Sequence, residues 1–321
     1  MKNTPSTIEH LKDYGKRITQ LRSAVYTPET EAVFWHEKKG SFLLPFITIT
    51  NMMYEGLAQD TGLPILNSIM PYAISRKAPP PVNNGTGWFI HEIDDWTHFA
   101  HNDIRWSVIA VMMHNHKPVE AYAHFPQQNK SLEIVAGKGC TEITYGHDDE
   151  VAKRRKIKKN TASPAVNITT PPASLIPETL QGAYFSLISQ QNCELVVNYT
   201  IIERALELID NGNAAYSLEL EFLDAYRKIQ RPSLAQIAAV QLLMDEYEGY
   251  AGTIFGNRFN FSKERTSGEG LIMSSNKDNY DALCHIAQAL PITRLISTPQ
   301  LFSPTSRRLE DLIKTEKIQL L

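Results

Sequence analysis

The stretch from Trp88 to Phe99 constrains the fold of this chain most, because an apolar segment there runs directly into a polar cluster. Its first residues, Trp88-Phe89-Ile90, are aromatic or β-branched, which is typical of a buried strand. A helix is predicted to begin just after the cluster. Ligand sites often lie at such junctions, because a helix N-terminus presents free N–H groups and a partial positive charge. The candidate site residues in this stretch are His91, Glu92, Asp94, Asp95, Trp96, Thr97 and His98.

The composition is that of an ordinary globular protein. The chain has 321 residues, of which 42% are hydrophobic and 21% charged, enough for one large domain or two joined subdomains. A net charge of −3 creates no overall field that would recruit nucleic acid or a membrane. The three cysteines, Cys140, Cys193 and Cys284, are widely spaced and argue against a disulfide framework or a structural zinc. With no signal peptide and no long apolar run, we expect a cytoplasmic protein without a membrane span.

Hydrophobic periodicity predicts two helices near the N-terminus. Ser6 or Thr7 can cap the first, and the second is expected over residues 27–40. The elements expected next are a strand-like run from residue 41, a helix over 52–59 and a short strand over 63–66.

Alternation of apolar and polar residues then predicts an antiparallel meander, closed by Gly137-Lys138-Gly139. Its three strands are expected over residues 107–113, 118–124 and 131–135. Further on, the predicted elements are helices over 201–210, 232–247 and 278–289, a strand over 270–274, loops over 78–85 and 161–172, and a terminal helix after 303.

A basic run covers residues 153–159 and follows the acidic residues 148–150. It could bind nucleic acid or an acidic partner. We favour a solvated hairpin that its acidic neighbours partly neutralise, because no aromatic side chains interleave with the run as single-strand binding requires. Likewise Glu203, Glu207 and Asp210 are expected to form a solvated helix face.

An ordered set of residues carries a resemblance to a known family. The set consists of Trp88, Ile90, Ile93, Asp94, Phe99, Lys117, Pro118, Pro126, Gly137 and Lys138, with weaker matches at 63–69, 210–216, 235–239 and 270–276. In motif, order and spacing these residues resemble the inositol monophosphatase superfamily, nearest to its 3′-nucleotidase (PAP phosphatase) branch. The resemblance covers roughly residues 41–290 and implies an α/β layered sandwich, the sugar phosphatase fold, and a homodimer. We expect one domain over 1–321, with subdomains at about 1–180 and 181–297 and a helical tail over 298–321.

The chain departs from the family at the positions that carry its chemistry. Such enzymes hold Mg²⁺ with carboxylates, and the ions polarise the phosphate and activate water. Of the family's ligand positions this chain keeps one carboxylate, Asp94. The other positions are occupied by His91, Ser68, Ile69 and Gln236, and no acidic residue matches near Pro45 to Thr50.

The phosphate-binding Gly-Thr of the family corresponds to Asp95-Trp96 here. A carboxylate at that place repels phosphate, and the indole ring fills the space that glycine leaves open. We therefore interpret the chain as a catalytically inactive relative, a pseudoenzyme repurposed to bind a small phosphorylated ligand or a partner.

Two alternatives stay open. His91 and Asp94, with His98, could hold Zn²⁺, Mn²⁺ or iron in an altered phosphomonoesterase, since imidazole with carboxylate suits these metals. Otherwise these polar groups bond one another and cap the following helix. The second alternative is an adaptor that uses the basic run 153–159.

Overall fold

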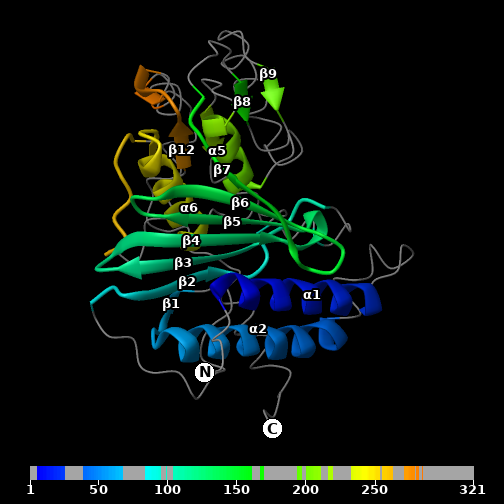
Figure 1. Ribbon diagram of the computed structural model, residues 1–321. Coiled ribbons are helices and arrows are strands. Elements are labelled where there is room, and N and C mark those ends of the chain that lie inside the picture. Colours follow the sequence, from blue (N-terminus) through cyan, green and yellow to red (C-terminus); the bar gives the residue numbers. More distant parts are fainter. Residues whose placement is uncertain are drawn as a thin grey trace.

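The computed structural model describes residues 6–25, 39–67, 84–94, 99, 104–160, 167–169, 194–196, 200–210, 216–219, 233–253, 255–262, 271–278, 280–281 and 284. These residues form stacked layers: a helix pair, a large sheet, a second helix pair and a smaller sheet (Figure 1). This is the α/β layered sandwich that the sequence predicts. Within the described ranges, no helix combines the length and the apolar content needed to cross a membrane.

The first layer consists of α1 (Thr7–Val25) and α2 (Lys39–Thr61), which run side by side below the large sheet in Figure 1. The two helices approach closely at Gly56, where a Cβ atom would lie 2.7 Å from Cε1 of His10. His10 Nε2 lies 2.6 Å from Asp60 Oδ2, which ties the two helices together at the same level.

The large sheet has seven strands in the order β1 to β7. β1 pairs with β2 in parallel and every later pair is antiparallel, so the sheet is mixed. The strands are β1 (Ile65–Asn67), β2 (Gly87–His91), β3 (Val108–His114), β4 (Lys117–Phe125), β5 (Lys130–Val135), β6 (Gly139–Tyr145) and β7 (Val151–Lys156).

The second helix pair, α5 (Ile201–Asp210) and α6 (Leu234–Glu246), lies between the large sheet and the smaller one (Figure 1). The smaller sheet has five strands in the order β11-β12-β10-β8-β9. These strands are β8 (Asn167–Thr169), β9 (Glu194–Val196), β10 (Tyr216–Glu219), β11 (Tyr250–Gly252) and β12 (Leu271–Ser274).

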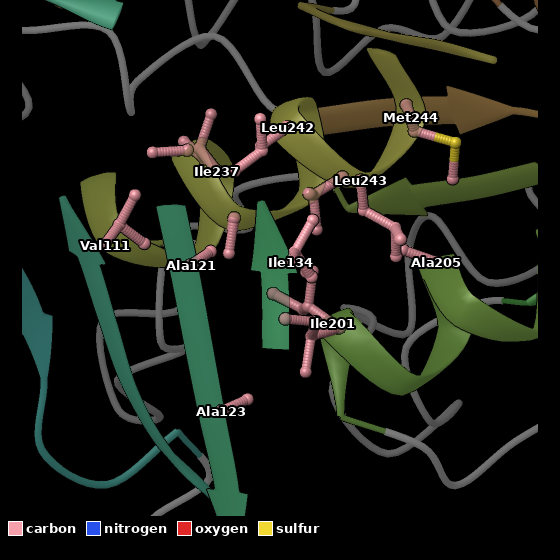
Figure 2. Close-up of a cluster of buried hydrophobic side chains, with 14 of the residues drawn as sticks. Val111, Ala121, Ala123, Ile134, Ile201, Ala205, Ile237, Leu242, Leu243 and Met244 are labelled. Atoms are coloured by element: carbon pink, nitrogen blue, oxygen red, sulfur yellow. The ribbon is translucent and has the colours of Figure 1, made fainter. Parts of the chain in front are cut away.

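The main core lies between the large sheet and α6. Val111, Ala121 and Ile134 of the sheet meet Ile237 and Leu243 of the helix, and all five are fully buried (Figure 2). Burial of a large aliphatic side chain stabilises the fold by about 2 kcal/mol. This packing is therefore what fixes the position of α6 and of the polar residues at its N-terminus.

The opposite face of the same sheet forms a second core with α1 and α2. Trp88 and Ile90 of β2 belong to this second core, whereas Phe89 between them belongs to the first. β2 is thus buried on both faces, which explains why its sequence is continuously apolar. The buried strand therefore fixes the position of His91, and of the residues after it, at the C-terminal end of β2.

Most predicted elements are confirmed. These are the first helix, the short strand near 63–66, the three-strand meander, the helices at 201–210 and 232–247 and the strand at 270–274. Ser6 caps α1, since its Oγ accepts a hydrogen bond from Glu9 N at 3.4 Å. The loop over 78–85 and the tail after 303 lie outside the described residues.

Three predictions are wrong. The strand-like run from residue 41 and the helix end at Gly40 are both absent, because α2 continues through them from Lys39 to Thr61. The predicted loop over 161–172 contains β8. The basic run forms the edge strand β7, which is the outer arm of an antiparallel hairpin with β6, as predicted.

Candidate functional site

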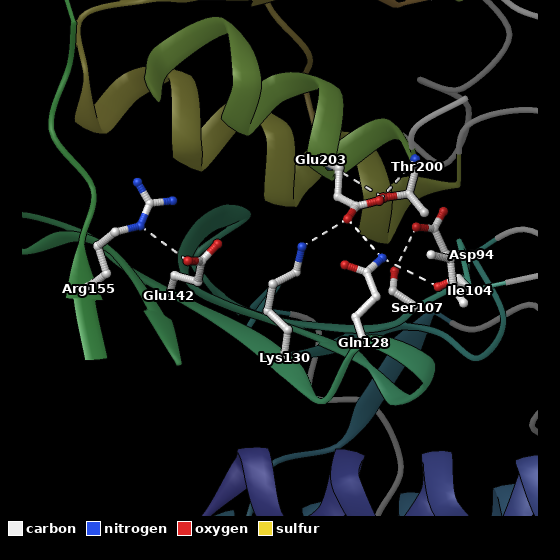
Figure 3. Close-up of polar contacts among 9 residues, drawn as sticks. All are labelled: Asp94, Ile104, Ser107, Gln128, Lys130, Glu142, Arg155, Thr200 and Glu203. Carbon is white, nitrogen blue, oxygen red and sulfur yellow. Dashed lines mark hydrogen bonds and ion pairs between the residues drawn. The ribbon is translucent and has the colours of Figure 1, made fainter. Parts of the chain in front are cut away.

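Asp94 is the centre of the candidate site and is only 4% exposed. Ser107 Oγ donates to Asp94 Oδ2 at 2.6 Å, and Gln236 Nε2 donates to Asp94 Oδ1 at 2.6 Å. The backbone N–H of Asp94 also donates to the Ser107 carbonyl at 2.8 Å. Both oxygens of the carboxylate therefore accept hydrogen bonds from neutral side chains of the protein itself; Figure 3 shows the one from Ser107.

The orientation of the Gln236 amide follows from a capping box at the start of α6. Ser233 is the N-cap: its Oγ accepts from Gln236 N at 3.1 Å, and its own N–H donates to Gln236 Oε1 at 2.7 Å. Because an amide oxygen only accepts, that bond turns the NH₂ group of Gln236 toward Asp94. The bond to Asp94 is thus set by the helix cap.

His91, the last residue of β2, is 1% exposed and bonds at both ring nitrogens. Nε2 lies 2.8 Å from the Ile93 carbonyl, which can only accept, so we assign the proton to Nε2. Nδ1 lies 2.5 Å from Ser233 Oγ, whose hydroxyl can donate to it. His91 therefore supports the N-terminus of α6, and a metal held by His91 and Asp94 stays a prediction that these contacts do not favour.

Glu92 is also buried, with 1% exposure, and joins the site to the first helix layer. Its Oε1 accepts a hydrogen bond from the Tyr54 hydroxyl of α2. Burial first, and the charge of Glu92 second, hold the pKa of Tyr14 on α1 well above its usual value. Glu92 therefore stabilises the interface between the first helix layer and the large sheet.

A second polar group, at the N-terminus of α5, is built around Glu203 (Figure 3). Glu203 Oε2 accepts from the N–H of Thr200 at 3.4 Å and from its Oγ1 at 3.2 Å, and Glu203 N donates to Thr200 Oγ1 at 3.3 Å. Oε1 accepts from Gln128 Nε2 at 3.0 Å and from Lys130 Nζ at 2.9 Å. The expected solvated face is thus wrong for Glu203, which is 8% exposed.

The caps of α5 and α6 both reduce the ability of these helix N-termini to bind a phosphate. Free N–H groups at a helix N-terminus are a ready site for phosphate. In α6 the Ser233 hydroxyl accepts from one such group, and in α5 the carboxylate of Glu203 lies at that place. A negative side chain there disfavours an incoming anion.

The described residues do not fit magnesium. Mg²⁺ takes hard oxygen ligands in near-octahedral geometry, commonly from one or two carboxylates together with water and phosphate. Here the Asp94 oxygens already accept from Gln236 and Ser107, and an amide NH₂ group points at the carboxylate. Among the side chains that the structure describes, no three of His, Cys, Asp and Glu come together in a group that could hold a metal ion.

The structure thus brings together two of the predicted site residues, Asp94 and Gln236, which are 142 positions apart in the chain. His91 lies beside them through Ser233. The candidates outside the described residues are Ser68, Asp95, Trp96, Thr97 and His98.

Sequence reasoning missed Ser107 and Ser233. The Ser-x-x-Gln spacing before the apolar run of α6 is a capping-box signal that could have identified Ser233. Ser107 opens a strand, and no local pattern marks it.

The arrangement of layers is that of known phosphatases. The chain is similar to CysQ from Bacteroides thetaiotaomicron, a bacterial member of the inositol monophosphatase family, with TM-score 0.60 and 16% identity over 84% of this chain and 96% of that one. It is similar to the Thermotoga maritima IMPase, with TM-score 0.60 and 14% identity over 91% and 98% of the two chains. Inositol monophosphatase II from Staphylococcus aureus gives TM-score 0.59 and 12% identity over 97% and 96%.

Sequence comparison adds nothing to these structural matches. No protein-family model matches the chain, and no curated protein does. At 16% identity or less, the matches define the fold class: the chain has the inositol monophosphatase fold.

Proposed function

We propose that this protein is a non-catalytic version of the inositol monophosphatase fold, in which a hydrogen-bonded network replaces the metal site. The protein then works by binding a ligand or partner and not by hydrolysing a phosphate ester. The observation that carries the proposal is the bond of 2.6 Å from Gln236 Nε2 to Asp94 Oδ1.

The charge at the site supports this proposal. A hydrogen bond from a neutral donor to a carboxylate is worth about 1.5–3 kcal/mol, and Asp94 accepts one at each oxygen. A cation at Asp94 would share these oxygens with Ser107 and Gln236, and the capping bond of Gln236 aims its NH₂ group, the positive end of the amide dipole, at the same carboxylate. Among the described side chains, no group of three from His, Cys, Asp and Glu is available to hold the cation.

The ligand class follows from the fold neighbours. One matching structure of the staphylococcal enzyme contains 2′-AMP and another contains inositol monophosphate. A small phosphorylated molecule is thus the first class to test here. Because the N-termini of α5 and α6 are both capped from within the chain, we expect such a ligand to bind weakly and without a metal bridge.

The test is a turnover assay of the purified chain. Inositol monophosphate, 2′-AMP and 3′-phosphoadenosine 5′-phosphate are each incubated with Mg²⁺, Mn²⁺ or Zn²⁺, and released phosphate is measured. We expect no release above the protein-free rate. Release by the wild-type chain that disappears in Asp94→Asn would overturn the proposal, because it would make Asp94 part of a working site.

A further inference from the structure

The basic run forms an open edge of the large sheet. β7 is the last strand in the order β1 to β7, and no strand of the described residues pairs with its outer side. Lys153, Arg154 and Lys156 on this strand and Lys158 just after it are exposed. An open edge presents backbone N–H and C=O groups to which another strand can bond.

Only part of the positive charge on this edge is neutralised within the described structure. Arg155 bonds Glu142 at 3.1 Å and Asp210 at 2.6 Å, so the acidic partners come from β6 and α5. Residues 148–150, the predicted acidic neighbours, form no ion pair with Arg155 in the described structure. Arg154 reaches Glu133 at 3.8 Å.

Three lysines are left over. Lys153, Lys156 and Lys158 form no ion pair with any described side chain. In an extended strand residues 153 and 156 point to opposite faces, so positive charge lies on both sides of the edge.

The register shows which backbone groups face outward. Ile157 N donates to the Cys140 carbonyl at 2.9 Å, which makes these two residues a hydrogen-bonded pair. Hydrogen-bonded and non-bonded pairs alternate along antiparallel strands. The N–H and C=O groups of Lys156 and Arg154 therefore point away from β6, toward the open side.

We propose that β7 is a docking edge for an extended acidic segment of a partner protein, which adds to the large sheet as an eighth strand. Outward backbone groups of Arg154 and Lys156 bond its main chain, as in known strand-addition complexes. Lys153, Lys156 and Lys158 select a segment that carries Asp or Glu. This inference is independent of the proposed function, since β7 lies on another part of the sheet from Asp94.

Two observations favour a protein segment over nucleic acid. The exposed residues of the run include no aromatic side chain on which a base could stack. The outward N–H and C=O groups of Arg154 and Lys156 match a peptide main chain, which nucleic acid lacks. Lysines on an edge also discourage pairing between copies of the same strand, so the same charges that select an acidic segment prevent self-association.

The experiment measures binding of a fluorescein-labelled peptide of alternating Glu and Thr by fluorescence anisotropy at low and physiological salt. Three exposed ion pairs together predict about tenfold weaker binding in the triple variant K153E/K156E/K158E. The matched control is Lys117→Glu, an exposed lysine at the start of β4, the middle strand of the sheet, which leaves affinity within about twofold.

Two variants at position 156 separate strand addition from simple charge attraction. Lys156→Gln removes the charge and keeps the N–H, whereas Lys156→Pro removes both and spares the pairing with β6. We expect the proline variant to bind several-fold more weakly than the glutamine variant. Equal affinity of these two variants, no loss in the triple variant, no binding by the wild-type chain, or tighter binding of polyuridylate than of the peptide would each overturn the proposal.

Discussion

Gln236 holds three groups in place: the Asp94 carboxylate, the N–H of Ser233 and, through it, the helix cap. Replacement by leucine keeps the volume but removes the donor and the capping oxygen. We expect Gln236→Leu to lower the free energy of unfolding by about 2–4 kcal/mol, measured by urea denaturation. Gln241→Leu is the control, because Gln241 is buried on the same helix and its Oε1 has no hydrogen-bond partner in the described structure. Equal losses in both variants would contradict the account.

The variant Gln236→Asp places a second carboxylate beside Asp94. Without a cation, the repulsion raises the pKa of one acid of the pair above its unfolded value. An acid with a raised folded pKa lowers stability as pH rises through that pKa. We therefore expect this variant to be less stable than wild type at pH 7 and to recover as the pH falls toward 5, in parallel urea titrations. Gln236→Asn, which brings no charge, should show no such recovery.

His124 on β4 gives the wild-type protein a pH dependence of its own. Burial first, and the charge of Lys12 second, lower its pKa to about 4. The unfolded chain binds this proton near pH 6.5 and the folded chain only near 4, so stability is lost as the pH falls through that window, by up to about 3 kcal/mol. His124→Gln should flatten the unfolding free energy between pH 6.5 and 4. An exposed control, His114→Gln, should leave the wild-type slope in place.

At the same scale, only part of the site could be predicted from the sequence. The motif around Asp94 and the helix start at Gln236 were visible because both keep the family's order. Their contact spans 142 positions and depends on the packing of α6 on the sheet, which no local pattern encodes. Ser107 completes the network from a strand end, where a serine carries no signal.

Among the elements, the meander and α6 were predictable because alternation and apolar spacing follow directly from which face is buried. α2 was not: residues 41–50 are rich in aromatic and β-branched side chains and contain Pro45, which favours a strand or a break. Burial of Phe46, Ile47 and Thr50 in the helix decides the conformation instead. β7 was predicted only as part of a hairpin without strand bounds, because five of its six side chains are exposed and lack alternation.

The contact between Glu246 at the end of α6 and the β5–β6 turn can be tested by mutation. Glu246 accepts from the N–H groups of Gly137 and Gly139, both at 2.8 Å, and so ties the β5–β6 turn to the helix. These glycines have φ of 73° and 79°, the region that glycine adopts without strain. Glu246→Ala should cost about 1–3 kcal/mol and speed hydrogen exchange at both amides. The exposed Glu150→Ala should change neither.

At the scale of the whole molecule, the chain has the layers of an inositol monophosphatase fold. Two cores fix the large sheet from both sides, and they place the ends of β2 and α6 next to each other whatever residues stand there. That placement gathers the neutral donors of Gln236 and Ser107 around the carboxylate of Asp94. In the function that we propose, this network contributes stability and holds no metal.

The most direct test is isothermal titration of Mg²⁺ into the wild-type protein at neutral pH, alone and with inositol monophosphate. We expect no saturable heat up to millimolar Mg²⁺ and a signal identical to that of Asp94→Asn. Stoichiometric binding at micromolar Mg²⁺ that is lost in Asp94→Asn would contradict the proposed function, because Asp94 would then be a ligand of the cation.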